Sequence, residues 1–255
     1  MTSPNRRTIF VGDNSFEYDV RTPERTQPRR GVSVSTTSIA EVKPSAKRRF
    51  PVKPTPERRL VPQFHGSPWN HYENRYAVKY GTLFGIITSR GTSSKQRMIR
   101  TISGADSAEQ VQKILELCHE NIVQSIEIYP GPDSSYFLIS EYMATSLMHL
   151  CRAPLYPNEP QLSSILYQVL KGVEFLLSQN AVHEKLSCAG ILIDFEGNVK
   201  IYDIEHCKQS GDATKLVVSP TVKQLLAHDF MQKKDQEELV WLVPLVLISA
   251  YHSRE

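Results

Sequence analysis

The sequence predicts an α+β domain in which a small β-rich part with one helix precedes a mainly helical part. Strand-like runs separated by turn residues fill the stretch from about 80 to 141, and a 3.6-residue apolar repeat marks residues 162–178. Residues 1–66 hold eight of the 16 prolines and no regular apolar spacing. Such a segment cannot bury enough apolar surface to offset its ordering entropy, so we expect a disordered tail before the domain.

The predicted tail is basic, with 13 Lys and Arg against 6 Asp and Glu, whereas the whole chain has a net charge of only +3. The remainder is therefore acidic overall, and nothing in it indicates nucleic-acid binding. Thr22 and Thr55 each precede a proline near arginines, where a phosphate would pair with guanidinium groups. Regulation at these threonines and chance recurrence of a low-complexity motif explain the pattern equally well.

The cysteines are too far apart to form a CxxC motif, which argues against a zinc site and favours reduced thiols in the cytosol. The first residues lack the apolar segment of a signal peptide. The most apolar run, Leu239–Tyr251, is shorter than the roughly 20 residues that span a bilayer. We expect a cytoplasmic protein with no membrane partner; the basic run Lys47–Arg49 offers a weaker nuclear alternative.

The first elements follow from hydrophobic spacing and turn residues. Strands are expected at Tyr80–Thr88 and Gln96–Ile102, joined by a polar hairpin turn. A helix is expected at Ser107–Cys118, where apolar residues recur at spacings of three and four. Two further strands, Ile122–Tyr129 and Tyr136–Glu141, flank a turn rich in proline and glycine.

The second half reads as mainly helical. Leu162–Ser178 has a clear apolar face, and Thr221–Lys233 and Asp235–Tyr251 are also expected to be helices. Between them, a polar loop opens at His183 and leads into the short strand Ile191–Ile193. The loop therefore lies where the β-rich and helical parts meet.

Residues from about Tyr76 to Tyr251 resemble the eukaryotic protein kinase domain. Four stretches carry the resemblance in the family's order: His119–Val123 (HENIV), Leu138–Met143 (LISEYM), His183–Ile193 (HEKLSCAGILI) and Gly197–Glu205 (GNVKIYDIE). They are similar to the family's HPNIV, its hinge, its catalytic loop HRDLKPENILI and its metal-binding GxVKIxDFG. The resemblance implies a two-lobed kinase-like fold over 67–255, with an N-lobe at about 72–143 and a truncated, mainly helical C-lobe at about 144–255.

The same resemblance implies that no catalytic position is intact. Lys185 stands where the family has its general-base Asp, and Gly190 replaces the metal-binding Asn. Gln110 replaces the helix glutamate, and Arg100 replaces the lysine that would pair with it. Phosphoryl transfer depends on these charges and on the base, so their joint loss predicts an inactive site. At best, an Arg100–Gln110 hydrogen bond replaces the family's ion pair.

A vestigial nucleotide pocket is implied as well. Of the three glycines of the family's phosphate-binding loop, only Gly85 is kept in the matched register; Tyr80 and Thr82 replace the others. The flexible side chain of Met98 replaces a small alanine and could fill the adenine position from inside. The implied pocket residues are Gly85, Ile87, Met98, Arg100, Met143 and Leu192.

Asp203 keeps the family's metal-binding position, with Glu205 two residues on. Together they could hold a divalent ion, because carboxylate oxygens suit such ions. Retention of Asp203 for local backbone capping is an equally good explanation. Lys185 could also pair with either carboxylate and take the place of the cation.

Three functions follow. The first is a catalytically inactive pseudokinase that acts as a signalling scaffold or allosteric partner of another protein, such as an active kinase, without a cofactor. The second is an atypical Ser/Thr kinase that uses ATP and Mg²⁺ weakly. The third is a truncated remnant with no function. Three explanations remain for the apolar faces of Leu239–Ile248: a partner covers them, the N-terminal tail folds back on them, or the sequence is a truncated gene product.

Overall fold

The computed structural model describes residues 61–91, 95–209 and 220–252. Its strands are β1 (Tyr72–Tyr80), β2 (Thr82–Ser89), β3 (Gln96–Ile102), β4 (Ser125–Pro130), β5 (Tyr136–Glu141), β6 (Thr145–Ser146), β7 (Ala181–His183), β8 (Ile191–Ile193), β9 (Val199–Ile201) and β10 (Cys207–Gln209). Its α-helices are α1 (Ser107–Glu116), α2 (Leu147–Arg152), α3 (Glu159–Ser178), α4 (Val222–Leu226) and α5 (Gln236–His252). Short 3-10 helices lie at Pro68–Asn70, Cys188–Gly190, Ile204–His206 and Asp229–Lys233. The motifs at Thr22, Thr55 and Lys47–Arg49 fall outside the described residues.

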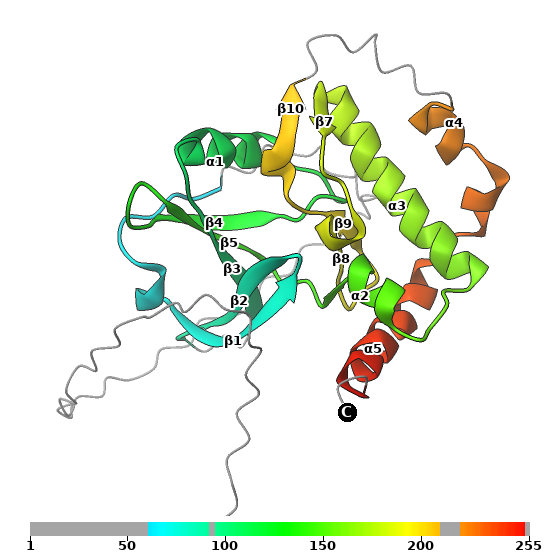
Figure 1. Cartoon of the computed structure of the whole chain (residues 1–255), viewed down its shortest axis with the longest axis horizontal. Coiled ribbons are helices and arrows are strands. Elements are labelled where there is room, and N and C mark those ends of the chain that lie inside the picture. The colour runs from blue at the N-terminus through cyan, green and yellow to red at the C-terminus, as the bar shows by residue number, and fades with distance from the viewer. Residues whose placement is uncertain (1–60, 92–94, 210–219, 253–255) are drawn as a thin grey trace, which may run out of the picture. The chain divides into compact units, whose positions relative to one another are not determined.

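A β-rich lobe with one helix precedes a mainly helical lobe, which confirms the expected α+β fold (Figure 1). Five antiparallel strands form one sheet in the order β1-β2-β3-β5-β4. In the helical lobe, α3 packs against α4, α5 and β9. Two small sheets, β7–β10 and β6-β8-β9, lie in the stretch that the sequence placed at the junction of the lobes.

The two faces of the large sheet bury different clusters, because side chains alternate along a strand. Phe84 and Ile86 of β2 pack with Met98 of β3 on one face. Ile87 and Ile99, one residue further along each strand, pack on the other face. The face that carries Met98 also contacts residues of the helical lobe, so it is the face on which a site between the lobes would form.

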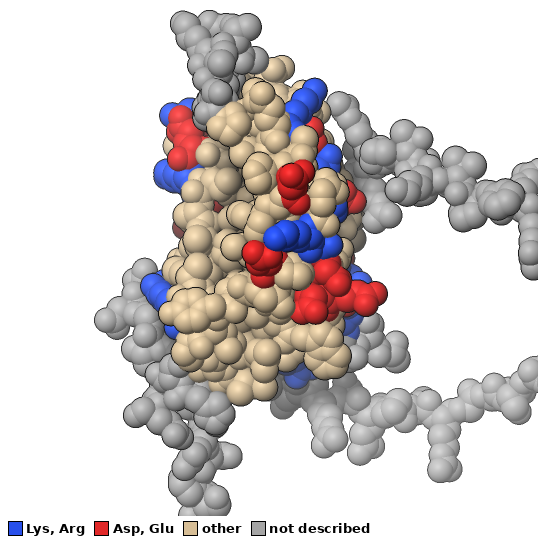
Figure 2. All heavy atoms as spheres, turned by 90° about the vertical axis from the view of Figure 1, so that its right-hand side faces the viewer, with Lys and Arg blue, Asp and Glu red and all other residues tan. Residues whose placement is uncertain are grey.

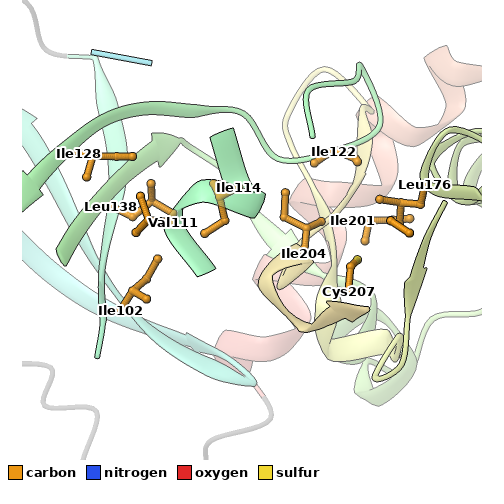
Figure 3. Close-up of a cluster of buried hydrophobic side chains, with 11 residues drawn as sticks. Ile102, Val111, Ile114, Ile122, Ile128, Leu138, Leu176, Ile201, Ile204 and Cys207 are labelled. Atoms are coloured by element: carbon orange, nitrogen blue, oxygen red, sulfur yellow. The ribbon is translucent and has the colours of Figure 1, made fainter. Parts of the chain in front are cut away.

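One buried cluster runs from the sheet into the helical lobe (Figure 3). Val111 and Ile114 of α1 lie between the sheet residue Leu138 and the helical-lobe residues Ile201 and Ile204. The helix α1 packs directly on the 3-10 helix Ile204–His206. This shared core fixes the segment after Asp203 beneath α1, where the resemblance expects a metal-binding loop.

The long helix α3 is specified at both its start and its middle. Asn158 and Gln161 form a reciprocal capping box, in which each side chain accepts a hydrogen bond from the other residue's backbone N–H. Gly172 allows close packing, because a Cβ there would lie 2.9 Å from Ile201 Cδ1 and 3.0 Å from the Asn121 carbonyl oxygen. Helix α3 therefore holds the strands of the loop region at close range.

Helix α5 is apolar around most of its circumference. Leu239, Leu242 and Val246 are buried in the helical-lobe core. Trp241 and Ile248 instead point to solvent and are 74% and 56% exposed. Among the described residues, no helix is both long enough and apolar enough to cross a membrane.

Three predicted boundaries were wrong. The strand expected at Tyr80–Thr88 is preceded by an unforeseen strand, β1, and Gly81 turns the chain between β1 and β2 with φ of +92°. The strand expected at Ile122–Tyr129 begins only at Ser125, because Ile122 forms a parallel bridge to Ile201 instead. The helix expected at Thr221–Lys233 is split into α4 and a 3-10 helix, because extended His228 caps the second segment.

Candidate functional site

The hairpin β1–β2 stands where the resemblance expects a phosphate-binding glycine loop. Tyr80 pairs with Thr82 across a tight turn made by Gly81. A Cβ on Gly81 would lie only 2.8 Å from the Cβ of Ala189, in the loop that matches the catalytic loop. Glycine is needed here both for its positive φ and for this close approach. The turn of the hairpin thus rests directly on the helical lobe.

The space between the lobes is filled by side chains of the protein itself. Phe84, Ile86, Met98, Met143 and Leu192 are all 0% exposed and belong to one cluster. Their partners in this cluster are Tyr80, Val123 and Tyr202. The expected pocket residues Met98, Met143 and Leu192 are therefore brought together, but in a close-packed core.

Tyr80 occupies the hinge side of this core. Its hydroxyl donates to the carbonyl oxygen of Ala144 at 2.6 Å and approaches that of Met143 at 3.4 Å. The ring meets His149 edge-on, with centroids 5.5 Å apart. Burial raises the pKa of Tyr80 well above its usual range, so the hydroxyl keeps its proton and remains a donor. A nucleotide base would have to displace this hydrogen-bonded ring.

Two of the expected pocket residues lie elsewhere. Ile87 packs on the far face of the sheet with Ile99, and Ile86 takes the inward position. Gly85 also faces outward, since a Cβ there would meet Ile99 at 2.9 Å. Because side chains alternate along β2, Gly85 and Ile87 share the face opposite to Ile86.

Arg100 projects from β3 toward the helical lobe and binds Glu205, not Gln110 as expected. Its guanidinium donates to both carboxylate oxygens of Glu205, and the Nη2–Oε2 distance is 2.9 Å. The two side chains are 8% and 5% exposed. Arg100 also lies over the Tyr202 ring, with Cζ 4.6 Å from the centroid. The cation that the resemblance assigns to nucleotide phosphates is thus neutralised by a carboxylate of the same chain.

The pKa values of the two carboxylates of the expected metal site are shifted in opposite directions. Burial would raise the pKa of Glu205, but the adjacent Arg100 guanidinium lowers it below its usual value. The pKa of Asp203 is raised, first by burial and then by the negative charge of Glu205. Asp203 also has a left-handed backbone, with φ of +62°. Glu205 is therefore the firmly ionised member of the pair.

Asp203 and Glu205 are not available together as ligands of a divalent ion. Both oxygens of Glu205 are engaged by Arg100, which leaves Asp203 as the one carboxylate of the pair that Arg100 does not bind. No group of three or more metal-binding side chains occurs in residues 61–91, 95–209 and 220–252. Mg²⁺ is commonly held by one or two carboxylates together with water and phosphate oxygens, so the engagement of Glu205 by Arg100 leaves one of the two expected carboxylate ligands.

The loop from His183 to Gly190 is held by backbone hydrogen bonds. His183 Nε2 lies 3.0 Å from the Tyr202 carbonyl oxygen, and its Nδ1 accepts from the Lys185 backbone N–H at 3.3 Å. Gly190 accepts from the Tyr202 N–H at 2.8 Å through its carbonyl oxygen. The Lys185 side chain is exposed and forms no ion pair with Asp203 or Glu205, contrary to the alternative considered above. In this loop, packing and backbone contacts take the place of catalytic groups.

The space that remains beside the Arg100–Glu205 ion pair is small. A cavity lined by Arg100, Ser140, Tyr202 and Asp203, among others, holds about 10 Å³. That volume admits about one water molecule. Sequence reasoning missed the residues that fill the site, namely Tyr80, Phe84 and Ile86. The one available signal was the replacement of a loop glycine by the aromatic Tyr80.

Comparison with known proteins agrees with this architecture. The family model for the protein kinase domain matches residues 87–238. The eIF-2-alpha kinase GCN2 of Mus musculus is 27% identical over 191 residues, covering 71% of this chain and 11% of its own length. The probable serine/threonine-protein kinase mkcB of Dictyostelium discoideum is 26% identical over 189 residues, covering 71% and 24%. The serine/threonine-protein kinase CLA4 of Candida albicans is 28% identical over 135 residues, covering 51% and 14%.

The chain belongs to the protein kinase domain family, since the family model covers more than half of it. It spans at most about a quarter of the length of these three relatives. The resemblance seen in four short motifs thus extends through the domain, and it establishes family and fold. Family membership does not establish activity. The packed cluster between the lobes bears on whether a nucleotide can bind there.

Proposed function

We propose that this protein is a pseudokinase: a kinase-like domain that neither binds nucleotide nor transfers phosphate, and that acts through contacts with other proteins. The observation that carries the proposal is the packed core between the lobes, where Phe84 and Met98 are wholly excluded from solvent. The Tyr80 hydroxyl bonds to the hinge backbone inside the same core. A nucleotide would have to unpack this core and leave hinge carbonyls without their donor, at a cost of several kcal/mol.

The charges of the site support the same proposal. Catalysis of phosphoryl transfer requires free positive charge at the phosphates and a base at the acceptor hydroxyl. Arg100 is neutralised by Glu205, and an exposed lysine, Lys185, stands at the position of the base. The potential ligands for a divalent ion are reduced to Asp203. Each change removes a different requirement of the reaction, so no ATP or Mg²⁺ cofactor is proposed.

The exposed face of α5 supports a protein partner. Trp241, Leu245 and Ile248 are apolar and solvent-exposed on a helix whose other side is buried. Contiguous apolar surface of this kind marks protein interaction sites. Tryptophan in particular is enriched among residues that dominate binding energy. We propose that the partner is a signalling protein such as an active kinase, and that the encounter takes place in the cytoplasm.

The described part of the face shown in Figure 2 carries no extended basic surface of the kind that binds nucleic acid or an acidic membrane. Figure 2 shows the side on which α3 and α4 lie in Figure 1; uncharged residues dominate it, and acidic and basic groups occur in small clusters of both signs. Nucleic-acid and membrane recognition rely on an extended basic face. The described part of the chain offers no such face in this view.

Phosphate transfer from labelled ATP by the purified full-length chain tests the proposal. With Mg²⁺ or Mn²⁺ present, we expect no incorporation into the chain itself or into a basic protein substrate above the level of a heat-denatured control. The matched variant Asp203→Ala should give the same background. Incorporation by the wild type that Asp203→Ala abolishes would overturn the proposal and establish an atypical active kinase.

A further inference from the structure

Two of the four cysteines lie side by side. Cys151 is near the end of α2, and Cys188 begins the 3-10 helix that corresponds to the middle of the catalytic loop. The two segments pack against each other, and the two thiols are within hydrogen-bonding reach. Both cysteines are reduced and exposed to solvent. They are therefore close enough to react with each other and open enough to be reached by a dissolved oxidant.

This pair is distinct from the other cysteines. Cys207 is buried in the core shared by the lobes, where no dissolved reagent reaches it. Cys118 is exposed but follows α1, which lies well apart from α2 (Figure 1). A disulfide requires two cysteines on neighbouring backbone segments, a condition that the packed segments of Cys151 and Cys188 meet and that distant cysteines do not. The chain thus contains one candidate pair and two internal controls.

We propose that Cys151 and Cys188 form a reversible disulfide that links α2 to the 3-10 helix Cys188–Gly190, the two helical-lobe segments against which the hairpin β1–β2 rests. The oxidant is a low-molecular-weight disulfide such as oxidised glutathione. One cysteine thiolate attacks it, forming a mixed disulfide and releasing one glutathione thiolate. The second cysteine, as its thiolate, then attacks the protein sulfur of the mixed disulfide and releases the other glutathione. Two protein thiols are oxidised, one disulfide is reduced, and the two protons pass to the released glutathione.

The bond would join two segments of the helical lobe that each contact the hairpin β1–β2. On one side, His149 of α2 packs edge-on against Tyr80, which sits at the end of β1. On the other side, Gly81 rests on Ala189, the neighbour of Cys188. A disulfide between Cys151 and Cys188 would hold both supports of the hairpin at a fixed separation. Oxidation would therefore stabilise the platform beneath the hairpin, which is already seated while both thiols are reduced.

The protonation of the pair is consistent with two adjacent thiols. Burial, and then the neighbouring Cys188 thiol, raise the pKa of Cys151. Cys151 therefore resists ionisation beside its neighbour, and a stepwise exchange through a mixed disulfide does not require two thiolates at once. The inference concerns regulation of the fold and stands whether or not the chain binds nucleotide.

Equilibration of the purified full-length chain in a series of glutathione buffers tests the proposal. Free thiols are alkylated, and peptides are mapped by mass spectrometry without reduction. In oxidising buffers we expect one linked peptide pair, Cys151–Cys188, which reverts on reduction, and a rise of several degrees in the melting midpoint. Cys118→Ser should behave like the wild type, while Cys151→Ser and Cys188→Ser should lose both the link and the rise.

Three results would overturn the proposal. Cys151 and Cys188 could remain fully alkylated in every buffer, or could each carry glutathione without becoming linked to each other. Alternatively, the link could form without raising the midpoint above that of the oxidised Cys151→Ser variant, which would show that the link does not stabilise the fold. Because Cys151 and Cys188 are both exposed, we expect the two Ser variants to fold. Unfolding of a variant would therefore not account for these results.

Discussion

Arg100 and Glu205, 105 residues apart in the sequence, form a buried two-point ion pair that joins the β-rich lobe to the helical lobe. Arg100 comes from the central strand β3, and Glu205 from the 3-10 helix on which α1 packs. The pair therefore has two effects on the site. It connects the lobes, and it neutralises the cation that stands at the position of the family's β3 lysine.

Removing one partner of this pair should be strongly destabilising. Glu205→Gln leaves the Arg100 guanidinium buried without its counter-ion, which lowers the free energy of unfolding by about 3–5 kcal/mol. The double variant Arg100→Met/Glu205→Leu should recover most of that loss, because it removes both charges. Urea denaturation measures the changes.

A surface pair supplies the matched control. Lys208→Met breaks the exposed pair with Glu184 and should change the free energy of unfolding by less than about 1 kcal/mol. If Glu205→Gln proves as mild as Lys208→Met, the pair does not join the lobes as the geometry indicates.

The pH dependence of stability should separate Glu205 from Asp203. The pKa of Glu205 is lower in the folded protein, so its contribution is present above its unfolded pKa and is lost as pH falls through its folded pKa. The pKa of Asp203 is raised, so its ionisation opposes folding once pH rises above the unfolded value. Asp203→Asn should therefore stabilise the protein at neutral pH and lose this advantage in acid.

Asparagine also suits the left-handed backbone of Asp203, so the substitution adds no strain. Urea melts of the wild type and Asp203→Asn between acid and neutral pH measure the difference. A neutral-pH destabilisation by Asp203→Asn would instead indicate that the charge is used, as a metal ligand would be.

The aromatic filling of the site should contribute much of the stability of the β-rich lobe. Phe84→Ala should cost about 3–5 kcal/mol, since it leaves a cavity among wholly buried side chains. Tyr80→Phe keeps the ring and removes only the hydroxyl bonded to Ala144, so about 1 kcal/mol should be lost. Leu83→Ala, on an exposed neighbour, is the control and should change stability by less than about 0.5 kcal/mol. Equal effects of Phe84→Ala and Leu83→Ala would contradict the packed site.

Gly81 should be intolerant of any side chain. Gly81→Ala places a Cβ 2.8 Å from Ala189 and forces an L-residue to adopt φ of +92°. The expected loss is about 1–3 kcal/mol or more, measured by urea denaturation. Ala189→Gly in the same chain should relieve the clash but not the backbone strain, so recovery should be partial. Full recovery would show that contact alone, and not conformation, requires the glycine.

The two faces of α5 should respond oppositely to charge. Trp241→Glu lies on the exposed face and should leave the melting midpoint nearly unchanged while reducing self-association or partner binding. Leu242→Glu, one residue away on the buried face, should unfold the helical lobe. Thermal melts and size-exclusion chromatography compare them. If Trp241→Glu destabilises as much as Leu242→Glu, the exposed face is part of the core.

Much of the fold was predictable because each of the family's motifs has a fixed place in the two-lobed fold. His119–Val123 and His183–Ile193 identified the lobe junction, and apolar spacing located α1 and α3. The details of the site were less accessible. Matching against a glycine-rich pattern could not reveal the tight turn at Gly81. Nor could it reveal that Ile86, and not Ile87, faces the cluster between the lobes.

The pairing of Arg100 with Glu205 was also missed, because it depends on how the lobes meet in space. The sequence carried one signal: a new carboxylate at the position of a family glycine. Pairing that charge with Arg100, instead of with a metal, would have required weighing a long-range contact over a local one. Likewise, a tyrosine in place of a loop glycine could point outward or inward, and only the packing around Phe84 selects the inward position.

The most direct test of the filled site is a thermal melt of the full-length chain with and without millimolar ATP and Mg²⁺. A ligand at 100 times its dissociation constant stabilises a protein by about 2.7 kcal/mol, which moves the midpoint by roughly 2–4 °C in a domain of this size. With Tyr80 and Phe84 packed as described, we expect one cooperative transition whose midpoint ignores nucleotide. An upward shift of that size would contradict the account, because it would require an open pocket between the lobes.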